Sequence, residues 1–459
     1  MLAGSGEGTA MMGERTVLQE SLFYSFNLDR HVPMDHLLRS IDRFVDLSGV
    51  RQHLQPFYSS VGRPSVDPEL MVRMLIVGYC FGIRSERRLC DEVHLNLGYR
   101  WFCRLSLDAA VPDHSTFSKA RHGRFRDADL LRRVFETVVR RCMAEGLVGG
   151  EGFAVDASII AADAHRQRGV DTPAELEPEA SRAVAEYLAM LDDAAFGAAT
   201  EVTPKFISPV DPAARWTAAS NGPAVYAYAD NYLIDLKCAV ILDVEPTTAV
   251  RQAEVTAAKT MIARTADRLG IDPARLAADT GYGSAEMLGW LVEERGIEPH
   301  IPVFDKSART DGSLSRADFT YDHAGDAYTC PQGKLLTTRG TLVNDGATLI
   351  YRASKFDCTA CELKPSCCPN TPARKVPRSI YEGARDMARE IAETDAYVVS
   401  RRERKKIEML FAHLKRILRL DRLRLRGPCG ARDEFLLAAT AQNLRKLAKL
   451  MPLPQPATG

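Results

Sequence analysis

The sequence contains no long hydrophobic run. A membrane-spanning helix needs roughly 18 consecutive apolar residues, and the best run in this 459-residue chain, residues 70–83, is interrupted by Arg73. The first twenty residues also lack the basic flank and the apolar core of a signal peptide. From these two absences we expect a cytoplasmic protein with no membrane partner.

Net charge is absent as well. Sixty Lys and Arg residues balance sixty Asp and Glu residues, so the total charge points to no class of partner. The charge is uneven along the chain, however, because residues 401–426 contain eleven Lys or Arg and only three Asp or Glu. A run of this kind is usually a solvated helix face, and the run alone does not exclude that reading.

Residues 22–148 carry helical patterns. Asp67 and Ser85 are suited to cap two helices, and Asp113 opens a third. Short helices joined by tight turns predict either a helix-turn-helix reader of DNA or a plain helical bundle with ordinary surface charge. The basic residues expected to be exposed there are Arg84, Arg87, Arg88, Lys119 and Arg121.

At Gly149 the pattern changes to strands alternating with helices. Residues 153–160 are a short apolar run typical of a buried strand, and residues 232–244 are the clearest strand in the chain. Such alternation predicts an α/β domain with a mixed sheet. We also expect a helix-bearing insertion or linker over 171–203, a helix over 255–269, short strands over 276–278 and 299–304, and helices from 395 to about 451.

Asp156 and Asp279 each lie in or just after an apolar strand and are followed by small residues. A carboxylate among apolar strand residues is costly to ionise unless a positive group compensates it. A turn cap or a salt bridge is the ordinary explanation for one such residue. Two of them at strand ends, where open α/β sheets place their sites, favour a metal site. The competing acids near the strands are Asp163, Asp230, Asp235 and the strongest rival, Asp243.

Glu408 is predicted from helix geometry to lie at the boundary between core and solvent. At about 100° per residue, Arg404, Glu408 and Lys415 lie within roughly 40° of one another along one edge of an apolar face. A surface Glu in charge pairs is the ordinary alternative. The excess of Lys and Arg around Glu408 favours a site that handles phosphates and a metal together. The expected apolar face consists of Ile407, Leu410, Phe411, Leu414, Ile417 and Leu418.

Three carboxylates suit phosphodiester chemistry. Mg²⁺ is a hard cation that takes oxygen ligands and keeps several waters, so a few carboxylates suffice. Two ions roughly 3.5–4 Å apart can activate the attacking oxygen and stabilise the leaving one. The adjoining Lys and Arg side chains would hold the DNA backbone. Asp156, Asp279 and Glu408 are therefore expected to bind two Mg²⁺ or Mn²⁺ ions.

Three motifs in the chain resemble those of the DDE transposases of bacterial insertion sequences. The first Asp stands in residues 155–158, VDAS, and the second in residues 279–282, DTGY. The Glu stands in the pattern Arg404-x3-Glu408-x6-Lys415. Each motif is short, but the three occur in the family's order.

The resemblance extends beyond these motifs and has one departure. Residues 62–117 resemble the family's helical amino-terminal domain, and residues 441–447 resemble its terminal helix, so the resemblance runs from about residue 22 to 450. The family's pattern also has a Tyr three residues before the Arg, where this chain has Arg401. That Tyr's role therefore has no counterpart here.

The resemblance implies an RNase H-like fold, with Asp156 on the first strand, Asp279 after the fourth and Glu408 on a late helix. It implies metal-dependent hydrolysis at transposon ends and attack of the freed 3′ hydroxyl on target DNA. The implied partners are double-stranded DNA, as terminal inverted repeats and as target, and a second copy of the chain in a homodimer. A bacterial protein of this kind is nucleoid-associated when bound to DNA. The implied DNA contacts are Arg404 and Lys415, with Arg401, Arg416 and Arg419 beside them.

Together these patterns give a domain plan. Residues 22–148 form a helical, helix-turn-helix-like DNA-binding domain, and residues 149–450 form the RNase H-like catalytic domain. The catalytic domain contains an insertion over 305–394. The plan is completed by a flexible amino-terminal segment, residues 1–21, and a tail, residues 451–459.

Five of the eleven cysteines lie between Cys330 and Cys368. In a reducing compartment they are thiols or metal ligands rather than disulfides. A C-x2-C pair and two further thiolates would close a tetrahedral structural zinc site. The spacing is irregular and a second C-x2-C pair is missing, so reduced structural thiols are the alternative. The expected ligands are Cys330, Cys358, Cys361 and either Cys367 or Cys368.

Two other functions fit part of the sequence. An RNase H-like nuclease or resolvase would share the carboxylates but would not join DNA ends. A non-enzymatic DNA-binding regulator would use the helical region and leave the carboxylates idle. End-joining activity separates the first from a transposase, and replacement of the carboxylates tests the second.

Overall fold

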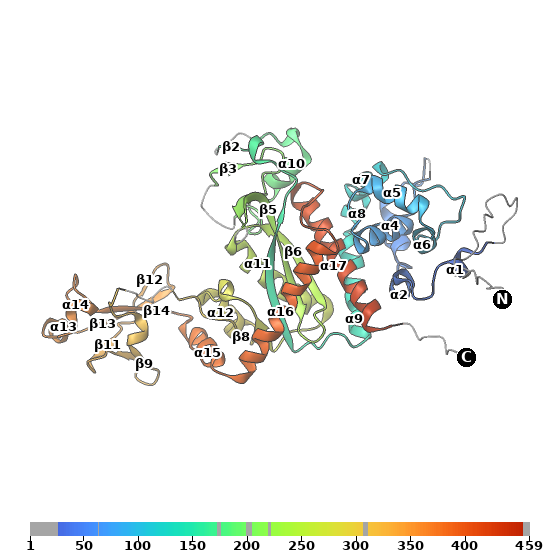
Figure 1. Cartoon of the computed structure of the whole chain (residues 1–459). Coiled ribbons are helices and arrows are strands. Elements are labelled where there is room, and N and C mark those ends of the chain that lie inside the picture. The colour runs from blue at the N-terminus through green and yellow to red at the C-terminus, as the bar shows by residue number, and fades with distance from the viewer. Residues whose placement is uncertain are drawn as a thin grey trace, which may run out of the picture.

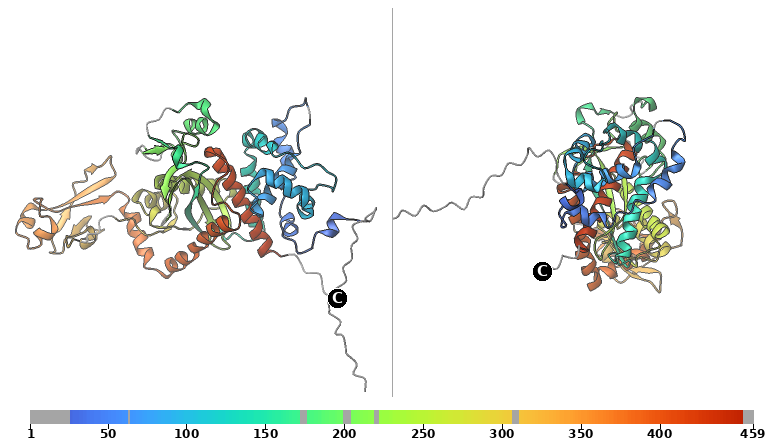
Figure 2. Two further views of the ribbon diagram at one scale, coloured as in Figure 1. Left: turned by 45° about the horizontal axis from the view of Figure 1, so that its top comes forward. Right: turned by 90° about the vertical axis from the view of Figure 1, so that its right-hand side faces the viewer.

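The computed structural model describes residues 26–62, 64–171, 176–198, 204–218, 222–305 and 311–452. The predicted amino-terminal segment and most of the predicted tail lie outside the described residues. The chain forms three parts in a row: a helical part, a central sheet with its helices, and a small β subdomain (Figure 1). Further views show the same order, with the subdomain standing away from the rest (Figure 2). In the described part, no helix is long and apolar enough to cross a membrane.

The amino-terminal part is helical, as predicted. Its helices are α1 (Leu28–His31), α2 (Leu37–Asp42), α3 (Val50–Leu54), α4 (Pro68–Cys80), α5 (Glu86–Leu95), α6 (Leu97–Phe102), α7 (Ser115–Arg121), α8 (Arg124–Asp127) and α9 (Leu130–Ala144). The Asp67 side chain caps α4 by accepting a hydrogen bond from the Glu69 amide. Ser85 caps α5 in the same way through the Arg88 amide. Both caps satisfy N–H groups that a first helical turn leaves without a partner.

The helical part shares its hydrophobic core with the rest of the chain. Helix α17 (Gly427–Leu450) packs against α2, α4 and α9, and one continuous cluster of buried side chains runs from Leu38 to Ala448. Gly82, between α4 and α5, has φ +68°, and a Cβ there would lie 2.9 Å from the Ile417 carbonyl oxygen. Glycine is therefore required where this turn meets the central part.

Two of the five basic residues expected to be exposed in the helical part are buried. The Arg84 guanidinium pairs with Glu434 of α17, and the two side chains are 6% and 1% exposed. Arg121 pairs with Glu86 at 2.6 Å and with Asp433 at 3.6 Å. A buried guanidinium is tolerated only where carboxylates compensate it, so these two arginines hold the helical part to α17 and cannot read DNA. The other three, Arg87, Arg88 and Lys119, are exposed as predicted.

A six-stranded mixed sheet forms the centre of the molecule. Its strands are β1 (Gly152–Ala161), β4 (Arg215–Ala218), β5 (Ala224–Asp235), β6 (Ile241–Thr248), β7 (Arg275–Ala277) and β8 (Glu298–His300). Strands β6, β5 and β1 are antiparallel neighbours, while β1, β7 and β8 are parallel neighbours. Strand β4 pairs with the first part of β5. The order β6-β5-β1-β7-β8 with these directions is that of an RNase H-like sheet, and it confirms the predicted fold class.

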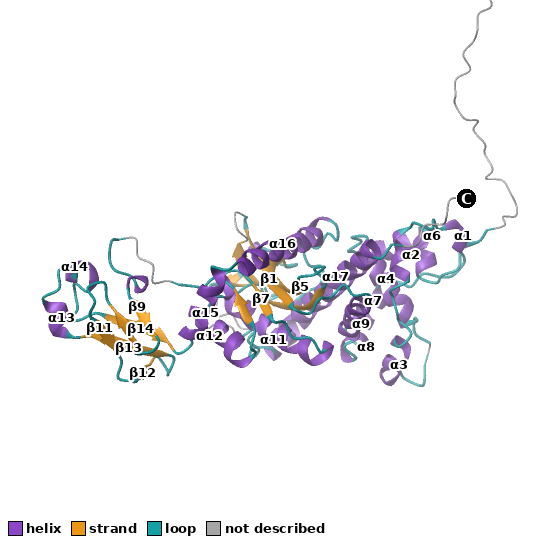
Figure 3. Cartoon of the chain, turned by 90° about the horizontal axis from the view of Figure 1, so that it is seen from below, coloured by secondary structure: helices purple, strands orange, loops and turns teal. Residues whose placement is uncertain are grey.

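Helices cover both faces of this sheet. Helix α16 (Asp395–Arg416) lies over one face, against β1, and α11 (Arg251–Leu269) lies over the other, against β5 and β6 (Figure 3). Side chains alternate between the faces along a strand. Tyr232 of β5 stacks on Phe411 of α16, with 4.9 Å between ring centroids, so the even-numbered residues of β5 near it face α16.

Residues 232–244 were expected as one strand and instead form the end of β5, a turn and the start of β6. The Asp235 carboxylate holds the turn by accepting hydrogen bonds from the Gly149 and Lys237 amides. Ala239 in the turn has φ +56°. Both strands are buried, so apolar side chains continue through the turn, and neither Gly nor Pro marks it in the sequence.

Most other predicted elements are present with shifted bounds. The strand expected over 299–304 is the shorter β8, and the helical region after residue 395 is broken between α16 and α17. Ile417, expected in the apolar face, is 48% exposed because α16 ends one residue before it. The described part of the 171–203 region contains α10 (Arg182–Ala189), while β2 (Val170–Asp171) and β3 (Phe206–Ile207) pair at its borders.

A separate β subdomain lies within the predicted insertion 305–394. Its elements are β9 (Thr320–Asp322), β10 (Ala327–Thr329), β11 (Leu335–Thr337), β12 (Leu342–Val343), β13 (Thr348–Ala353), α13 (Lys355–Thr359), α14 (Lys364–Cys367) and β14 (Lys375–Ser379). It has its own small core, formed by Phe319, Tyr328, Leu336, Tyr351 and Val376. By contrast α15 (Glu382–Ala392), at the end of the insertion, packs against α12 (Ala285–Gly289) and β8 of the central part.

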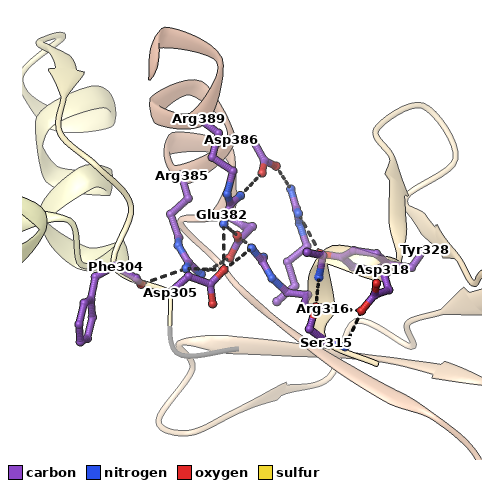
Figure 4. A network of polar contacts seen from close by, with 12 residues as sticks. Phe304, Asp305, Ser315, Arg316, Asp318, Tyr328, Glu382, Arg385, Asp386 and Arg389 are labelled. Carbon is purple, nitrogen blue, oxygen red and sulfur yellow. Dashed lines mark hydrogen bonds and ion pairs between the residues drawn. The ribbon is translucent and has the colours of Figure 1, made fainter. Parts of the chain in front are cut away.

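Arginines and carboxylates join the subdomain to α15 (Figure 4). Glu382 of α15 is 1% exposed and pairs with Arg316, which precedes β9. One turn further along α15, Asp386 pairs at 2.9 Å with Arg378 of β14. This network therefore fixes the subdomain to the central part at two points. Its members are Asp305, Arg316, Arg378, Glu382, Arg385, Asp386 and Arg389.

Candidate active site

Asp156 lies on β1, on the face that α16 covers. Its carboxylate accepts a hydrogen bond from the Ala157 amide at 2.8 Å and lies 3.4 Å from Arg404 Nη1. The pKa of Asp156 is raised to about 6, and burial is the largest cause. The hydrogen bond from Ala157 and the charge of Arg404 lower this pKa, while the charges of Asp279 and Glu408 raise it. The other two predicted carboxylates are thus close enough for their charges to act on Asp156.

Asp279 follows β7, the parallel neighbour of β1. The register pairs Ala154 with Ala277, and two residues further along each strand come Asp156 and Asp279, so the parallel sheet carries both toward the same end. The Asp279 side chain accepts a hydrogen bond from the Gly281 amide at 2.7 Å. A Cβ on Gly281 would lie 2.7 Å from Asp279 Oδ1, so a glycine leaves room for this carboxylate.

Glu408 lies on α16, in the predicted helical region, and faces Arg404. Arg404 Nη2 lies 3.9 Å from Glu408 Oε1, so Arg404 stands between Glu408 and Asp156. The Glu408 side chain is 56% exposed. Helix α16 therefore places Glu408 at the solvent edge of the two sheet carboxylates.

Two further residues at this site were not predicted from the sequence. Glu254, in the first turn of α11, has a raised pKa because of burial; Arg251 lowers it, and Asp156 and Asp279 raise it. The Tyr282 hydroxyl is buried and has no hydrogen-bond partner among the described residues. A Glu in a first helical turn is common because it suits the helix dipole, so no sequence pattern marks Glu254.

Three of the four competing carboxylates have other partners. Asp243 is buried between Arg132 and Arg264, and its Oδ2 lies 2.7 Å from Arg264 Nε. Asp163 pairs with Arg422 at 3.0 Å and with another arginine of the same loop. Asp235 holds the β5–β6 turn. The strongest rival, Asp243, is therefore a structural ion pair.

The exposed face of α16 is basic. Four cations, at positions 401, 402, 405 and 416, fall within roughly 100° of the helix circumference, and Glu408 lies at the border of this arc. Arg419 lies just beyond the end of α16. Among the residues that the structure describes, neither the four cations nor Arg419 has an ion-pair partner within 4.0 Å. We call this set the α16 basic face; it consists of Arg401, Arg402, Lys405, Arg416 and Arg419.

The donor set suits a hard divalent cation, because three carboxylates offer only oxygen ligands. In the described ranges, no three His, Cys, Asp or Glu side chains converge closely enough to hold one ion. Like charges repel where no cation compensates them, and Arg404 occupies the space between two of the carboxylates. The three carboxylates are thus neighbours, and their oxygens must move closer together to bind an ion.

All five clustered cysteines line one cavity of about 420 Å³ in the β subdomain. The Cys330 sulfur accepts a hydrogen bond from the Lys334 amide at 3.4 Å, and Gly333 in this turn has φ +70°. Burial raises the pKa of Cys367 to about 11, with a further contribution from Cys368. The remaining cysteines of the cavity are Cys358 and Cys361.

Two protein-family models match the chain. A model described as a transposase domain matches residues 26–123, in the helical part. A model described as a transposase DDE domain matches residues 329–448, which include Glu408 and its flanking Arg404 and Lys415. The chain belongs to the DDE transposases. The RNase H-like core, the metal-dependent DNA cleavage and the strand transfer expected of such a transposase follow from this membership.

Membership of the family also gives the class of cofactor and partner. DDE transposases generally use divalent metal ions such as Mg²⁺, and transposases bind DNA. The match to the DDE domain begins at residue 329, so Asp156 and Asp279 of this transposase lie outside the matched residues. Their part in the site rests on the geometry described above.

One solved structure aligns with most of the chain. It is titled as a cryo-EM structure of the piggyBac transposase synaptic complex with hairpin DNA. The alignment covers 94% of this chain and 84% of that chain, at 10% sequence identity and a TM-score of 0.35. A TM-score this low supports no conclusion about this transposase.

Proposed function

We propose that this transposase cuts the ends of its element and joins them to target DNA with Asp156, Asp279 and Glu408 as the residues that hold two divalent cations. The observation that carries the proposal is the position of these carboxylates beside the α16 basic face. Phosphodiester chemistry needs oxygen ligands for a metal and cations for the DNA backbone in the same place. Here α16 supplies one of the three carboxylates, Glu408, together with the cations.

Each residue has a distinct part in the proposed site. Asp156 and Asp279 offer oxygen donors from a rigid sheet, and Glu408 offers a third from α16. When bound, two divalent ions polarise the attacking oxygen and stabilise the leaving oxygen. Arg404 offsets the repulsion between Asp156 and Glu408 when no metal ion is bound. When metal ions are bound, its guanidinium can turn to a phosphate.

The proposed DNA contacts lie along α16. Arg404 and Lys415 would hold the end DNA near the cut, and Arg401, Arg416 and Arg419 would follow the phosphates beside it. Their partners are the terminal inverted repeats and the target DNA, both double-stranded. Since two ends are processed together, we propose that the active form is a homodimer.

We also propose the domain plan of residues 22–148 for DNA binding and 149–450 for catalysis. Three exposed cations of the helical part support its role in binding DNA: Arg87, Arg88 and Lys119. The packing of α17 against this part would keep bound end DNA fixed relative to the carboxylates.

Mg²⁺-dependent cleavage of end DNA is expected to weaken as the pH falls through about 6. The pKa of Asp156 is raised to about 6, so below that pH the metal must displace a proton from this carboxyl. The Mg²⁺ concentration for half-maximal cleavage should rise about tenfold per pH unit below 6 and stay flat above 7. Cleavage of a duplex carrying the element's own end, titrated with Mg²⁺ from pH 5 to 8, measures this.

A matched titration of the Asp272→Asn variant is the control, since it removes an exposed surface carboxylate that pairs with Arg295 and keeps Asp156, so its half-saturation should change with pH as in the wild type. A half-saturation that does not change between pH 5 and 8 in the wild type would contradict the proposed ligand. Chelation of all divalent ions should abolish cleavage at every pH, and cleavage that persists without metal would overturn the proposed function.

We further propose that the cysteine cavity holds one structural Zn²⁺, for which the described thiols, like the carboxylates, would have to move closer together. Thiolates are preferred zinc ligands, and an N–H donated to a sulfur in a glycine turn, as at Cys330, is compatible with a metal-bound thiolate. The fourth ligand would be Cys367 or Cys368, beside Cys358 and Cys361. Four thiolates leave no open position, so the zinc would have no catalytic part.

Metal analysis of the purified transposase is expected to find about one zinc per chain. Cys361→Ser should lose this zinc and lower the thermal unfolding temperature of the protein, because the subdomain core is small. Cys90→Ser, in α5, should keep the zinc. If the wild type carries no zinc after purification and re-addition, the five thiols are reduced structural residues.

A further inference from the structure

A buried carboxylate that is not one of the proposed metal ligands, Asp230, lies on β5, the strand next to β1. Strands β1 and β5 pair Asp156 with Tyr232 and Ser158 with Asp230. Directly paired residues of antiparallel strands point to the same face. Asp230 therefore faces α16, like Asp156, and is one ladder step away from it.

Asp230 is 0% exposed. Neither of its carboxylate oxygens has a hydrogen-bond partner at ordinary distance and angle among the described residues. A carboxylate removed from water is costly unless a cation or hydrogen bonds compensate it. The adjacent Tyr232 hydroxyl donates to Gln442 Oε1 at 2.9 Å; it also lowers the pKa of Asp230, but as a neutral group it cannot balance a full negative charge.

Lys415 of α16 is the cation in the right place. Phe411 stacks on Tyr232, and Lys415 follows Phe411 by one helical turn, which carries it along the same face toward Asp230. Burial raises the pKa of Asp230, and Tyr232 and then Lys415 lower it. Burial lowers the pKa of Lys415, and Asp230 and then Asp421 raise it. The charges of Asp230 and Lys415 therefore act on each other.

The same arrangement occurs twice along α16. Arg404 pairs with Asp156 on β1 at 3.4 Å, and Lys415, eleven residues or about 16 Å further along the helix, acts through its charge on Asp230 of β5. By contrast, the cations of the α16 basic face have no ion-pair partner in the described part of the chain. Arg404 and Lys415, at one edge of the helix, are thus the α16 cations that act on the sheet carboxylates Asp156 and Asp230.

We propose that Asp230 is a positioning residue whose buried carboxylate holds the Lys415 ammonium at the edge of the catalytic site, ready to contact a DNA phosphate. A lysine side chain has many rotamers, and fixing it before DNA binds reduces the entropy lost on binding. The inference rests on the proposed role of Lys415 as a DNA contact.

The test measures how the binding of end DNA depends on salt. The probe is a duplex carrying the element's own end, and its dissociation constant is measured from 50 to 300 mM KCl, roughly the range over which counterion release acts. Each phosphate contact contributes about 0.9 to the slope of log K against log salt. Lys415→Met should therefore lower the slope by about 0.9, and Asp230→Asn should lower it by the same amount.

The double variant Asp230→Asn/Lys415→Met should lose no more than either single variant, because both changes remove one contact. Asp235→Asn is the matched control. It removes another buried carboxylate of β5, one that holds the β5–β6 turn rather than Lys415. Its slope should equal that of the wild type. The Mg²⁺ half-saturation of cleavage should be unchanged in Asp230→Asn, because Asp230 is not a proposed metal ligand.

The outcomes separate the inference from the function on which it rests. A lowered slope in Lys415→Met with a wild-type slope in Asp230→Asn overturns the positioning role alone. A wild-type slope in Lys415→Met overturns the DNA contact, and the positioning role with it, while the metal-dependence of cleavage still tests the carboxylates. If Asp230→Asn does not fold, the double variant should fold again, because it leaves no unpaired buried charge; a double variant as unstable as the single one overturns the pairing.

Discussion

Replacing Asp156 with asparagine is expected to abolish the cleavage of end DNA by this transposase. Asparagine keeps the volume of the side chain and its contact with the Ala157 amide, but it removes the negative charge that would hold a divalent ion. The loss should be about 10³-fold or more, the scale on which removal of a central catalytic group acts. Single-turnover cleavage of a labelled end duplex in Mg²⁺ measures it.

Asp279→Asn and Glu408→Gln should show losses of the same order, while Glu254→Gln should lose only about 10- to 100-fold, as residues that support metal ligands do. Asp272→Asn is the control, because this exposed carboxylate precedes β7 and pairs with Arg295 at the surface. It should cleave at the wild-type rate. Wild-type cleavage by any one of the three ligand variants would remove that residue from the site.

Binding separates this loss from misfolding. Since Asp156 repels phosphates, Asp156→Asn should bind end DNA at least as tightly as the wild type in the absence of divalent ions. A variant that neither binds nor cleaves has lost its fold, and its melting temperature would show that. A variant that binds without cleaving has lost the chemistry alone.

Replacing Glu382 with alanine is expected to destabilise the link between the β subdomain and α15. Glu382 is 1% exposed and pairs with three arginines, at positions 316, 385 and 389. Removing one partner from a buried ion pair leaves the other charges uncompensated and typically costs about 3–5 kcal/mol. Urea unfolding followed by circular dichroism should show an early transition that the wild type lacks.

Glu390→Ala is the matched control on the same helix. Glu390 is exposed, so its replacement should change the unfolding free energy by no more than about 0.5 kcal/mol. Equal unfolding curves for Glu382→Ala and Glu390→Ala would show that the network in Figure 4 contributes nothing to stability. Because α15 also packs on α12 and β8, a true destabilisation should reduce cleavage as well.

Local patterns were enough to predict the fold class and many of its helices and strands. The apolar run over 153–160 identified β1, because a strand buried on both faces is apolar throughout. The caps at Asp67 and Ser85 could be predicted because each side chain accepts a hydrogen bond from an amide no more than three residues later. Glu408 was placed at the edge of its helix by a period of 3.6 residues, which the sequence carries directly.

The errors arose where a residue's partner lies far away in the chain. Arginine is usually a surface residue, but Arg84 and Arg121 are buried because they pair with Glu434 and Asp433. These partners lie more than 300 residues later in the chain. The turn between β5 and β6 is held by Asp235, which accepts hydrogen bonds from the Lys237 amide and from the distant Gly149 amide, and neither Gly nor Pro marks it in the sequence. Asp243 and Asp156 have similar surroundings in the sequence, yet one faces two arginines in the core and the other faces Arg404 at the site.

The sequence by itself determined that this protein has three carboxylates on two strands and a helix, a basic helix beside them and a cysteine cluster in an insertion. Only the tertiary structure decided which charges compensate which. It placed Asp156 and Asp279 in register, added Glu254 to them and buried Asp230 opposite Lys415. The physical reason is that the free energy of an ionised group depends on the charges and the solvent within a few ångströms of it, and folding sets those distances across the whole chain.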